Sequence, residues 1–336
     1  MIRQIRHWYD LFLATIWLTL AFARAAWHFR TRALHDLALP QPAALSSREK
    51  RRLKHYYYGT TYLGVVFCTL RSYPRSRREE YLFTNLAALA CFFDDLVDAY
   101  RENDDSGRKW QDNPEEYGRT ADSRGLALHF LHNIYRELPP GDLEQFKTFM
   151  HGVFNVETAG RQHSSAAPGA SGLEKTMAEK GGCSVLLFRR LLPNPLSDPE
   201  REALFQFGHL IQLCDDIFDL WHDRQAGNHT LATYLAERND VARLIQVFEN
   251  QVIVVMGALR AIARVDPTSS GVGPTRAVIH FLVSITRVCL RRYADLQEKR
   301  GTLPLDDRAA MVVDMEKWSN RLRAVRELLI DHQRSF

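Results

Sequence analysis

The chain has 336 residues, of which 46% are hydrophobic and 25% are charged. This is ample for one large core, although the length also allows two domains. The 44 basic residues exceed the 40 acidic ones by only four, so the charge does not argue for binding to nucleic acid. The five cysteines are scattered without metal-ligand spacing, which is typical of small core residues in a reducing cytosol.

The first predicted helix spans residues 5–30 and contains the uncharged run 11–23. The run has 13 residues, fewer than the roughly 18–20 that a membrane-spanning helix needs. Trp8, Tyr9 and Trp27 extend it with aromatic rings, as in a helix that lies at a membrane surface. A buried core helix explains the same run equally well. The odd number of cysteines argues against an exported protein with a signal peptide, so we expect a cytoplasmic protein, with peripheral membrane contact through this helix as one alternative.

Helical periodicity continues along the rest of the chain, without a block of alternating strand pattern. Prolines and glycines interrupt it at residues 39–42, 139–141, 193–195 and 267–274. Further helices are predicted over residues 47–71, 76–102, 120–137, 141–164, 171–192, 198–225, 239–265, 271–299 and 305–334.

Two polar stretches, 102–119 and 163–172, are predicted to be loops. The chain contains no internal repeat of fixed period and no change of composition that would mark a domain boundary. One all-α domain over residues 1–336 is therefore the economical interpretation.

Two acidic clusters stand in apolar helical sequence, where carboxylates are unfavourable unless something binds them. The first contains Asp94 and Asp98, which share one helix face at 3.6 residues per turn. The second contains Asp215, Asp219 and Asp223, which form a ladder over two turns and are called the acidic ladder below. Like charges at this spacing repel, so nothing local stabilises either stripe. Two such stripes facing each other would suit Mg²⁺ shared with the phosphate oxygens of a substrate.

The two clusters and the all-α pattern resemble the class I isoprenoid synthase superfamily. This superfamily includes prenyltransferases, squalene and phytoene synthases, and terpene cyclases. Residues 208–219 are similar to the second aspartate-rich motif of the prenyltransferases, with Ile211 where these enzymes usually have Phe. The acidic ladder matches the spacing of the metal triad of terpene cyclases. Residues 179–182 resemble the segment in which a lysine contacts diphosphate and the helix breaks. The resemblance covers about residues 56–300.

The resemblance implies a single-domain helical bundle around a central apolar cavity, and an enzyme that uses Mg²⁺, three ions with substrate bound. The ions would neutralise charge on the diphosphate that leaves an allylic substrate. Its metal-binding residues would be Asp94, Asp95, Asp98, Asp215, Asp219 and Asp223, and all of these except Asp95 would also be catalytic.

The same resemblance implies two further groups of side chains. Aromatic rings would line the apolar part of the cavity and stabilise a carbocation, although each ring taken singly is more typical of plain core. These rings are Phe92, Phe93, Phe218 and Trp221. Polar side chains would bind the diphosphate, and Gln212, a single polar residue in a core helix, has the alternative of bonding within the protein. This group is Lys180, Gln212, Arg224, Arg292 and Tyr293.

Departures from the family patterns favour one branch of the superfamily. Prenyltransferases bind a second substrate with a glycine-rich basic segment and an Arg-Arg pair. The upstream basic residues Arg51, Arg52 and Lys54 lack the glycines, and residues 99–102 read Ala-Tyr-Arg-Glu in place of the pair. Cys91 stands where squalene and phytoene synthases usually have Arg, although residues 73–98 have the layout of their first motif. Arg292 and Tyr293 fall where bacterial terpene cyclases carry a late Arg-Tyr pair.

We therefore expect a terpene synthase that ionises one prenyl diphosphate, cyclises or eliminates, and releases diphosphate. One alternative is an enzyme of the squalene and phytoene synthase type that joins two prenyl diphosphates head to head. Another is a non-catalytic helical protein that binds prenyl lipids or membranes. A homodimer is a further expectation from the superfamily.

Overall fold

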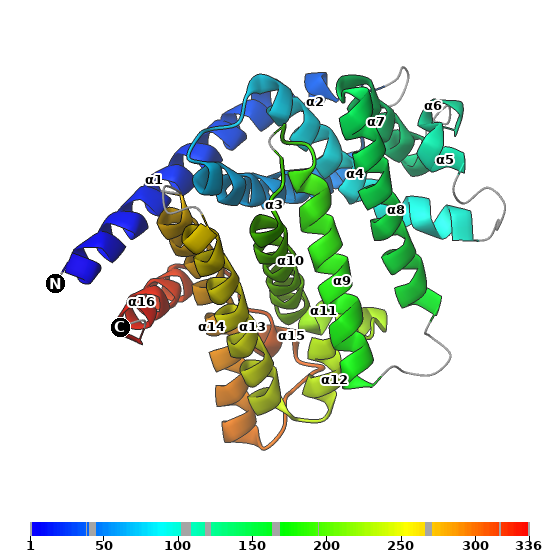
Figure 1. Cartoon of the computed structure of the whole chain (residues 1–336). Helices are drawn as coiled ribbons and strands as arrows, with labels where there is room; N and C mark the ends of the chain where they lie inside the picture. The colour runs from blue at the N-terminus through cyan, green and yellow to red at the C-terminus, as the bar shows by residue number, and fades with distance from the viewer. Residues whose placement is uncertain are drawn as a thin grey trace. The chain divides into compact units, whose positions relative to one another are not determined.

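In the part of the chain that the computed structural model describes, every regular element is a helix, as Figure 1 shows. The all-α prediction is thereby confirmed. The described residues are 2–37, 39, 45–101, 109–117, 122–162, 169–193, 195–265, 271–315 and 317–334. In chain order the helices are α1 (Ile2–Thr31), α2 (Ala33–Asp36), α3 (Ser47–Arg71), α4 (Arg77–Arg101), α5 (Lys109–Asp112), α6 (Pro114–Tyr117), α7 (Ser123–Glu137), α8 (Pro140–Gln162), α9 (Ala170–Arg189), α10 (Asp198–Phe218), α11 (Leu220–Ala226), α12 (Leu231–Glu237), α13 (Val241–Val265), α14 (Val272–Arg300), α15 (Arg308–Met311) and α16 (Trp318–Arg334).

The helices form two compact units, each drawn from separate stretches of the chain. The first unit consists of Met1–Phe12, Gln162–Gly182 and Leu196–Phe336. The second consists of Leu13–Arg161 and Cys183–Pro195. Helices α1 and α9 therefore contribute residues to both units. The expectation of a single domain stays a prediction.

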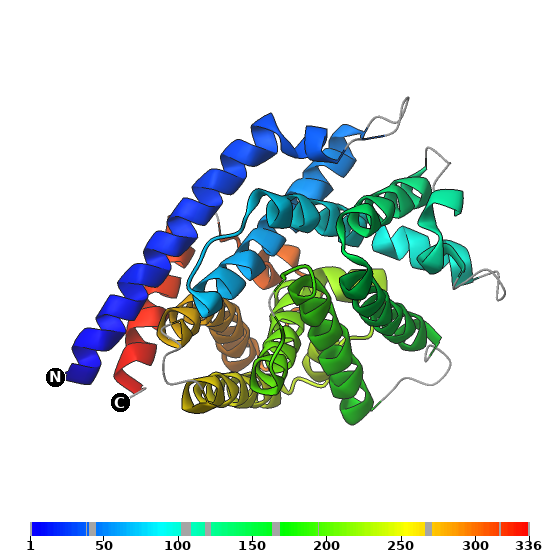
Figure 2. The ribbon, with the colours of Figure 1, turned by 45° about the horizontal axis from the view of Figure 1, so that its top comes forward.

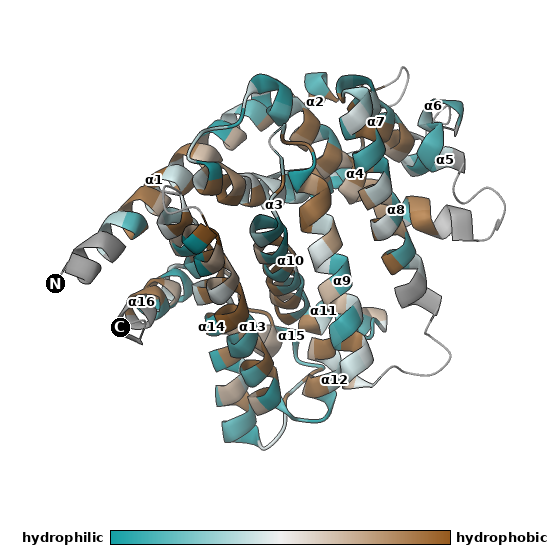
Figure 3. Cartoon of the chain, viewed as in Figure 1, coloured by the Kyte–Doolittle hydropathy of each residue, from teal (hydrophilic) through white to brown (hydrophobic). Residues whose placement is uncertain are grey.

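The core of the first unit is built around α10. This helix packs against α13 and α14, and α14 in turn packs against α16. Apolar residues recur along α10 at the spacing of one helix face, and they are fully buried at Phe207, Leu210, Leu213 and Ile217. Figure 3 shows the alternation of hydrophobic and hydrophilic residues along these helices. A buried face of this kind stabilises a helix more than its intrinsic propensity does.

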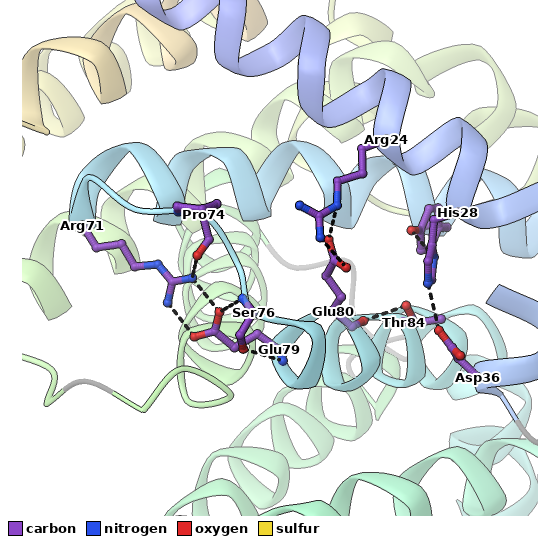
Figure 4. A network of polar contacts seen from close by, with 10 residues as sticks. Arg24, His28, Asp36, Arg71, Pro74, Ser76, Glu79, Glu80 and Thr84 are labelled. Carbon is purple, nitrogen blue, oxygen red and sulfur yellow. Dashed lines mark hydrogen bonds and ion pairs between the residues drawn. The ribbon is translucent and has the colours of Figure 1, made fainter. Parts of the chain in front are cut away.

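The second unit is held by α4, which packs against α7 and α3. Its start is fixed by polar contacts, drawn in Figure 4. Ser76 caps α4: its hydroxyl accepts from the backbone N–H of Glu79 at 3.2 Å, and the Glu79 carboxylate accepts from the Ser76 N–H at 2.7 Å. Arg71, in the last turn of α3, donates to both carboxylate oxygens of Glu79 at 2.7 Å. The turn between the two helices is thus held by one carboxylate.

Most predicted helix boundaries agree with the structure to within a few residues. Two predicted helices and one predicted loop differ, and the short helices α2 and α12 are missing from the prediction. Residues 198–225 bend at Asp219, which separates α10 from α11. Residues 305–334 form two helices, because Asp307 caps the short α15 and the chain turns extended at Val312. The predicted loop 102–119 contains the single-turn helices α5 and α6. Part of that loop, and residues 163–168 of the second predicted loop, lie outside the described residues.

Among the described residues, two helices are long and apolar enough to cross a membrane by length and composition alone, α1 over Trp8–Thr31 and α13. Core helices and signal sequences meet the same criterion. Helix α13 buries Leu244, Phe248 and Val255 in the first unit, as a core helix does. Helix α1 instead exposes a row of large apolar side chains, namely Trp8, Tyr9, Phe12, Ile16, Leu20 and Trp27.

The Arg71–Glu79 pair provides a test of how the second unit is held together. The side chains are only 10% and 7% exposed, so Glu79→Gln leaves a buried guanidinium without its counter-charge. We expect a loss of about 3 kcal/mol in the free energy of unfolding, measured by urea denaturation. Glu80→Gln is the matched control, because Glu80 pairs with Arg24, which is 54% exposed. The control should lose less than about 1 kcal/mol; equal losses would contradict this account.

Candidate functional site

The acidic ladder lies where α10 passes into α11. Helix α10 begins at Ser197, whose hydroxyl accepts from the Glu200 N–H, with Pro199 in the first turn. At Asp219 the backbone leaves the helical conformation (φ −93°, ψ 8°). The hydrogen bonds nevertheless continue, because the Asp219 N–H donates to the Asp215 carbonyl and the Asp223 N–H to the Asp219 carbonyl, each at 2.8 Å. The three carboxylates therefore keep the one-turn spacing that the sequence predicts.

The ladder carboxylates are unfavourably placed for their charge. Asp215 and Asp219 are exposed to solvent and Asp223 is half-buried. Burial by the surrounding protein nevertheless raises the pKa of Asp215 to about 6, and the charge of Asp219 adds to the effect. Water therefore reaches Asp215 while dense protein surrounds its other sides. Desolvation also raises the pKa of Asp223, against the hydrogen bond that Asn228 Nδ2 donates to it at 3.0 Å.

Asp216 points into the protein, away from the ladder. It is 6% exposed, and burial raises its pKa to about 7. Gln212 Nε2 donates to its carboxylate at 2.8 Å, which opposes that shift. The amide of Gln212, predicted to contact diphosphate, is thus engaged inside the protein. Gln212 holds the buried acid beside the ladder.

Helices α9 and α10 cross with their backbones in contact. A Cβ atom added at Gly181 would overlap the carbonyl oxygen of Gly208, and one added at Gly208 would overlap the carbonyl oxygen of Gly181. A Cβ atom at Gly182 would overlap the ring of Phe205. Glycine is therefore required at the crossing for lack of a side chain. Helix α9 continues through Gly181 and Gly182, so the helix break expected at this segment is not present.

The crossing brings Lys180 to the acidic residues. Its positive charge lowers the pKa values of Asp215, Asp216 and Asp223, against the larger effect of burial. The structure thus brings Lys180 within electrostatic reach of three carboxylates in the first unit, those of Asp215, Asp216 and Asp223. This is the part of the predicted site that the described residues assemble.

The other predicted diphosphate ligands are engaged within the protein. Arg224 Nη1 donates to Asp306 Oδ1 at 2.6 Å, and Arg224 Nε lies 3.9 Å from Glu237 Oε1. Arg292 Nε donates to the carbonyl of Ala310 at 3.1 Å. Tyr293, which is 1% exposed, donates from its hydroxyl to the carbonyl of Ile217 at 2.9 Å.

Tyr293 is thereby a positioning residue. Its hydrogen bond fixes α14 to the last turn of α10, two residues from both Asp215 and Asp219. Burial raises the pKa of its phenol, so the hydroxyl remains a donor. Neither this bond nor the one from Asn228 is visible in the sequence, because each joins residues that no periodic pattern relates.

The predicted aromatic residues divide between the two units. Phe92 and Phe93 are buried in α4, and the Phe92 ring lies 6.1 Å from that of Phe130 as ordinary core packing. Phe218 and Trp221 are half-buried beside the ladder. The guanidinium of Arg308 lies 5.7 Å from the centre of the Trp221 ring. The Trp221 ring is therefore placed to interact with positive charge.

The first acidic cluster belongs to α4 in the second unit. The side chains of Asp94 and Asp98 lie outside the described residues, although their backbone is helical. Asp95 Oδ2 lies 3.7 Å from Arg52 Nη1. Among the described side chains, no three His, Cys, Asp or Glu residues are grouped closely enough to hold a metal ion. A site formed by both clusters together stays a prediction.

Comparisons with known proteins do not decide between these interpretations. No profile of a known protein family, no curated protein and no solved structure matches the chain. The candidate site must therefore be judged from its own residues.

The helix crossing predicts a specific sensitivity to methyl groups. We expect Gly208→Ala to lower the free energy of unfolding by at least about 2 kcal/mol, because a backbone carbonyl cannot move aside as a flexible side chain does. Gly257→Ala in α13 is the control, because a Cβ atom there meets nothing within 4 Å. It should raise stability by about 0.5–1 kcal/mol. If both variants unfold alike in denaturant, the contact between the two backbones is refuted.

Asp216 predicts a dependence of stability on pH. The folded state keeps its proton up to about pH 7, whereas the unfolded chain loses it near the ordinary value of 3.8. The folded state therefore binds more protons in this window, and stability falls as the pH rises through it. Asp216→Asn cannot ionise, so it should be more stable than wild type at pH 8 by on the order of 1–3 kcal/mol. The two proteins should converge near pH 4. A variant less stable than wild type at pH 8 in thermal denaturation would overturn this assignment.

Proposed function

We propose that the protein is a Mg²⁺-dependent class I terpene synthase, which ionises an allylic prenyl diphosphate, cyclises or eliminates, and releases diphosphate. The observation that carries this proposal is the acidic ladder. Three carboxylates stand one turn apart along α10 and α11, two of them with raised pKa values, and Lys180 approaches them across a glycine contact.

The ladder fits a hard divalent cation by the chemistry of its donors. Carboxylate oxygens are the ligands that Mg²⁺ takes in proteins, together with substrate phosphates. Desolvation and mutual repulsion raise the pKa values of Asp215 and Asp223, so both carboxylates gain from a cation nearby. In this proposal Asp215, Asp219 and Asp223 hold the metal in the first unit, and the role expected of Asp94, Asp95 and Asp98 stays a prediction. Bound Mg²⁺ supplies electrostatic stabilisation to the departing diphosphate.

The remaining residues of the site bind and position. Lys180 contributes an ammonium group that binds a phosphate oxygen. Arg224 would also bind phosphate, after its guanidinium leaves the carboxylates of Asp306 and Glu237. The exchange is inexpensive because the Asp306 side chain is 86% exposed, and exposed ion pairs contribute little to stability. Gln212 and Tyr293 keep α10 in register through their buried hydrogen bonds.

The half-buried rings of Phe218 and Trp221 supply the apolar side of the proposed site. A carbocation needs surroundings that exclude water and present ring faces. Phe218 precedes Asp219 and Trp221 follows it by two positions, which puts these rings beside the carboxylates that would hold the metal. The allylic diphosphate would then ionise close to the rings that stabilise the resulting carbocation.

The proposal is tested with the purified full-length protein, Mg²⁺ and single allylic diphosphates of increasing length. Released diphosphate is assayed, and hexane extracts are analysed by mass spectrometry. A hydrocarbon or alcohol of unchanged carbon number supports a terpene synthase. A product of doubled carbon number assigns the protein to head-to-head condensation instead. No diphosphate release with any substrate contradicts both enzymes and favours a protein that only binds lipid.

Removal of one ladder charge should abolish most of the activity. Asp219→Asn keeps the size of the side chain and loses a metal ligand, so we expect a fall of at least about 100-fold in turnover. The matched control is Asp295→Asn, which alters an exposed carboxylate of α14 outside the ladder. The control should retain wild-type turnover. Equal activity of both variants, measured as diphosphate release, would remove the ladder from the mechanism.

A further inference from the structure

Helix α16 carries an apolar stripe that is exposed in the described part of the chain. Trp318 is 74% exposed, Leu322 65%, Val325 51% and Leu329 41%. At 3.6 residues per turn these four positions fall within roughly 60° of the helix circumference. The buried residues Ala324 and Leu328 lie away from that arc and face α14. Single exposed apolar residues are ordinary, but a row of four along three turns is not.

Cationic side chains flank this stripe. Arg321 and Arg326 lie on either side of it by their helical positions, and Arg323 is exposed farther round. The guanidinium of Arg321 lies 5.5 Å from the centre of the Trp318 ring. Glu327 is buried and paired with Arg291 at 2.7 Å, so it does not offset these charges at the surface. The exposed part of α16 from Trp318 to Leu329 is thus apolar and positively charged.

The start of α1, in the same unit, also exposes large apolar side chains. The first turns of α1 lie side by side with the end of α16 in both views of the ribbon (Figure 1 and Figure 2). There α1 exposes Trp8, Tyr9 and Phe12, at 48%, 59% and 62%. Two helices of this unit therefore carry large exposed apolar side chains.

We propose that α16 is a membrane-binding helix, which lies in the surface of an anionic lipid bilayer with its apolar stripe among the acyl chains. An apolar stripe edged by arginines matches such a surface, because anionic headgroups attract the cations while the acyl chains take up the aromatic and aliphatic groups. The mean hydropathy of α16 is too low for a helix that spans the membrane, and helices that lie in the interface have this combination of features. This inference goes beyond the proposed enzyme activity and does not rest on it.

The test measures co-sedimentation of the full-length protein with vesicles of phosphatidylcholine alone and of phosphatidylcholine with phosphatidylglycerol at 3:1. We expect wild type to bind the anionic vesicles more tightly. Trp318→Gln with Leu322→Gln should weaken binding at least about tenfold, because two large apolar groups are lost. Arg321→Gln with Arg326→Gln should weaken binding to anionic vesicles on the order of 30-fold. Binding to neutral vesicles should stay unchanged for the arginine variant.

Two further variants make the test specific. Ile253→Gln with Val254→Gln removes exposed apolar surface from α13, where Ile253 is 69% exposed, and should bind as wild type does. Phe12→Gln with Leu20→Gln probes the exposed row of α1. Because every substituted side chain is exposed, circular dichroism should show an unchanged fold for each protein.

The inference fails if the Trp318 and Leu322 variant binds vesicles as tightly as wild type. It also fails if only the α1 variant loses binding, because α1 alone would then hold the protein at the membrane. Light scattering in the absence of lipid measures the oligomeric state, and so distinguishes membrane binding from association with a second copy of the chain. A wild-type dimer that the Trp318 and Leu322 substitutions convert to a monomer, with no vesicle binding, assigns the stripe to a second copy of the chain.

Discussion

The contact between the backbones of α9 and α10 is the constraint on which the candidate site depends. Gly181 and Gly208 each occupy the space in which a side chain of the other would stand. Helix axes separated by ordinary side chains lie 8–10 Å apart, and only glycine at the crossing allows a closer approach. The closeness brings Lys180, the neighbour of Gly181, to carboxylates two turns farther along α10. A larger residue at either position would separate the cation from the acids.

The acids themselves are held against their electrostatic preference. Asp215 and Asp223 are partly desolvated and feel the charge of Asp219, while Asp216 is buried and bonded to Gln212. Hydrogen bonds from Tyr293 and Asn228 fix the surrounding backbone and the last carboxylate of the ladder. Such an arrangement lowers the stability of the folded protein at neutral pH, and a bound cation would relieve it. Strained electrostatics of this kind are typical of functional sites, although structural networks also shift pKa values.

The helices could be predicted from sequence because their signals are local. Ser197 before Pro199, and the apolar periodicity of α10, define that helix without reference to the rest of the chain. The one-turn spacing of the acidic ladder is equally local. The bend at Asp219 could not be predicted, because the helical hydrogen bonds continue through it and no glycine or proline marks it. The split of residues 305–334 escaped prediction because no glycine or proline marks the extended residue Val312.

The partners of the predicted ligands could not be predicted either. Arg224 reads as a phosphate ligand in sequence, yet it pairs with Asp306, a residue 82 positions away. Tyr293 is joined to Ile217 across 76 positions. Contacts of this kind depend on how α14 and the segment before α15 pack against α10, which no pattern in one stretch of sequence encodes. The sequence therefore predicts which residues carry charge near the ladder, and the fold determines how each one is used.

The first helix also bears on how the protein can be shortened. Helix α1 contributes Asp10, whose charge acts on Arg276, to the first unit, and it contributes Arg24 and His28 to the second. His28 lies between the Tyr57 hydroxyl and the Asp36 carboxylate, each at 2.8 Å. A protein that begins after Thr31 would lack Arg24, which pairs with Glu80, and His28, which bonds Asp36. It would also lack Asp10, whose charge acts on Arg276. Helix α1 is a structural part of both units, so its removal is expected to destabilise the fold as well as to remove an exposed apolar helix.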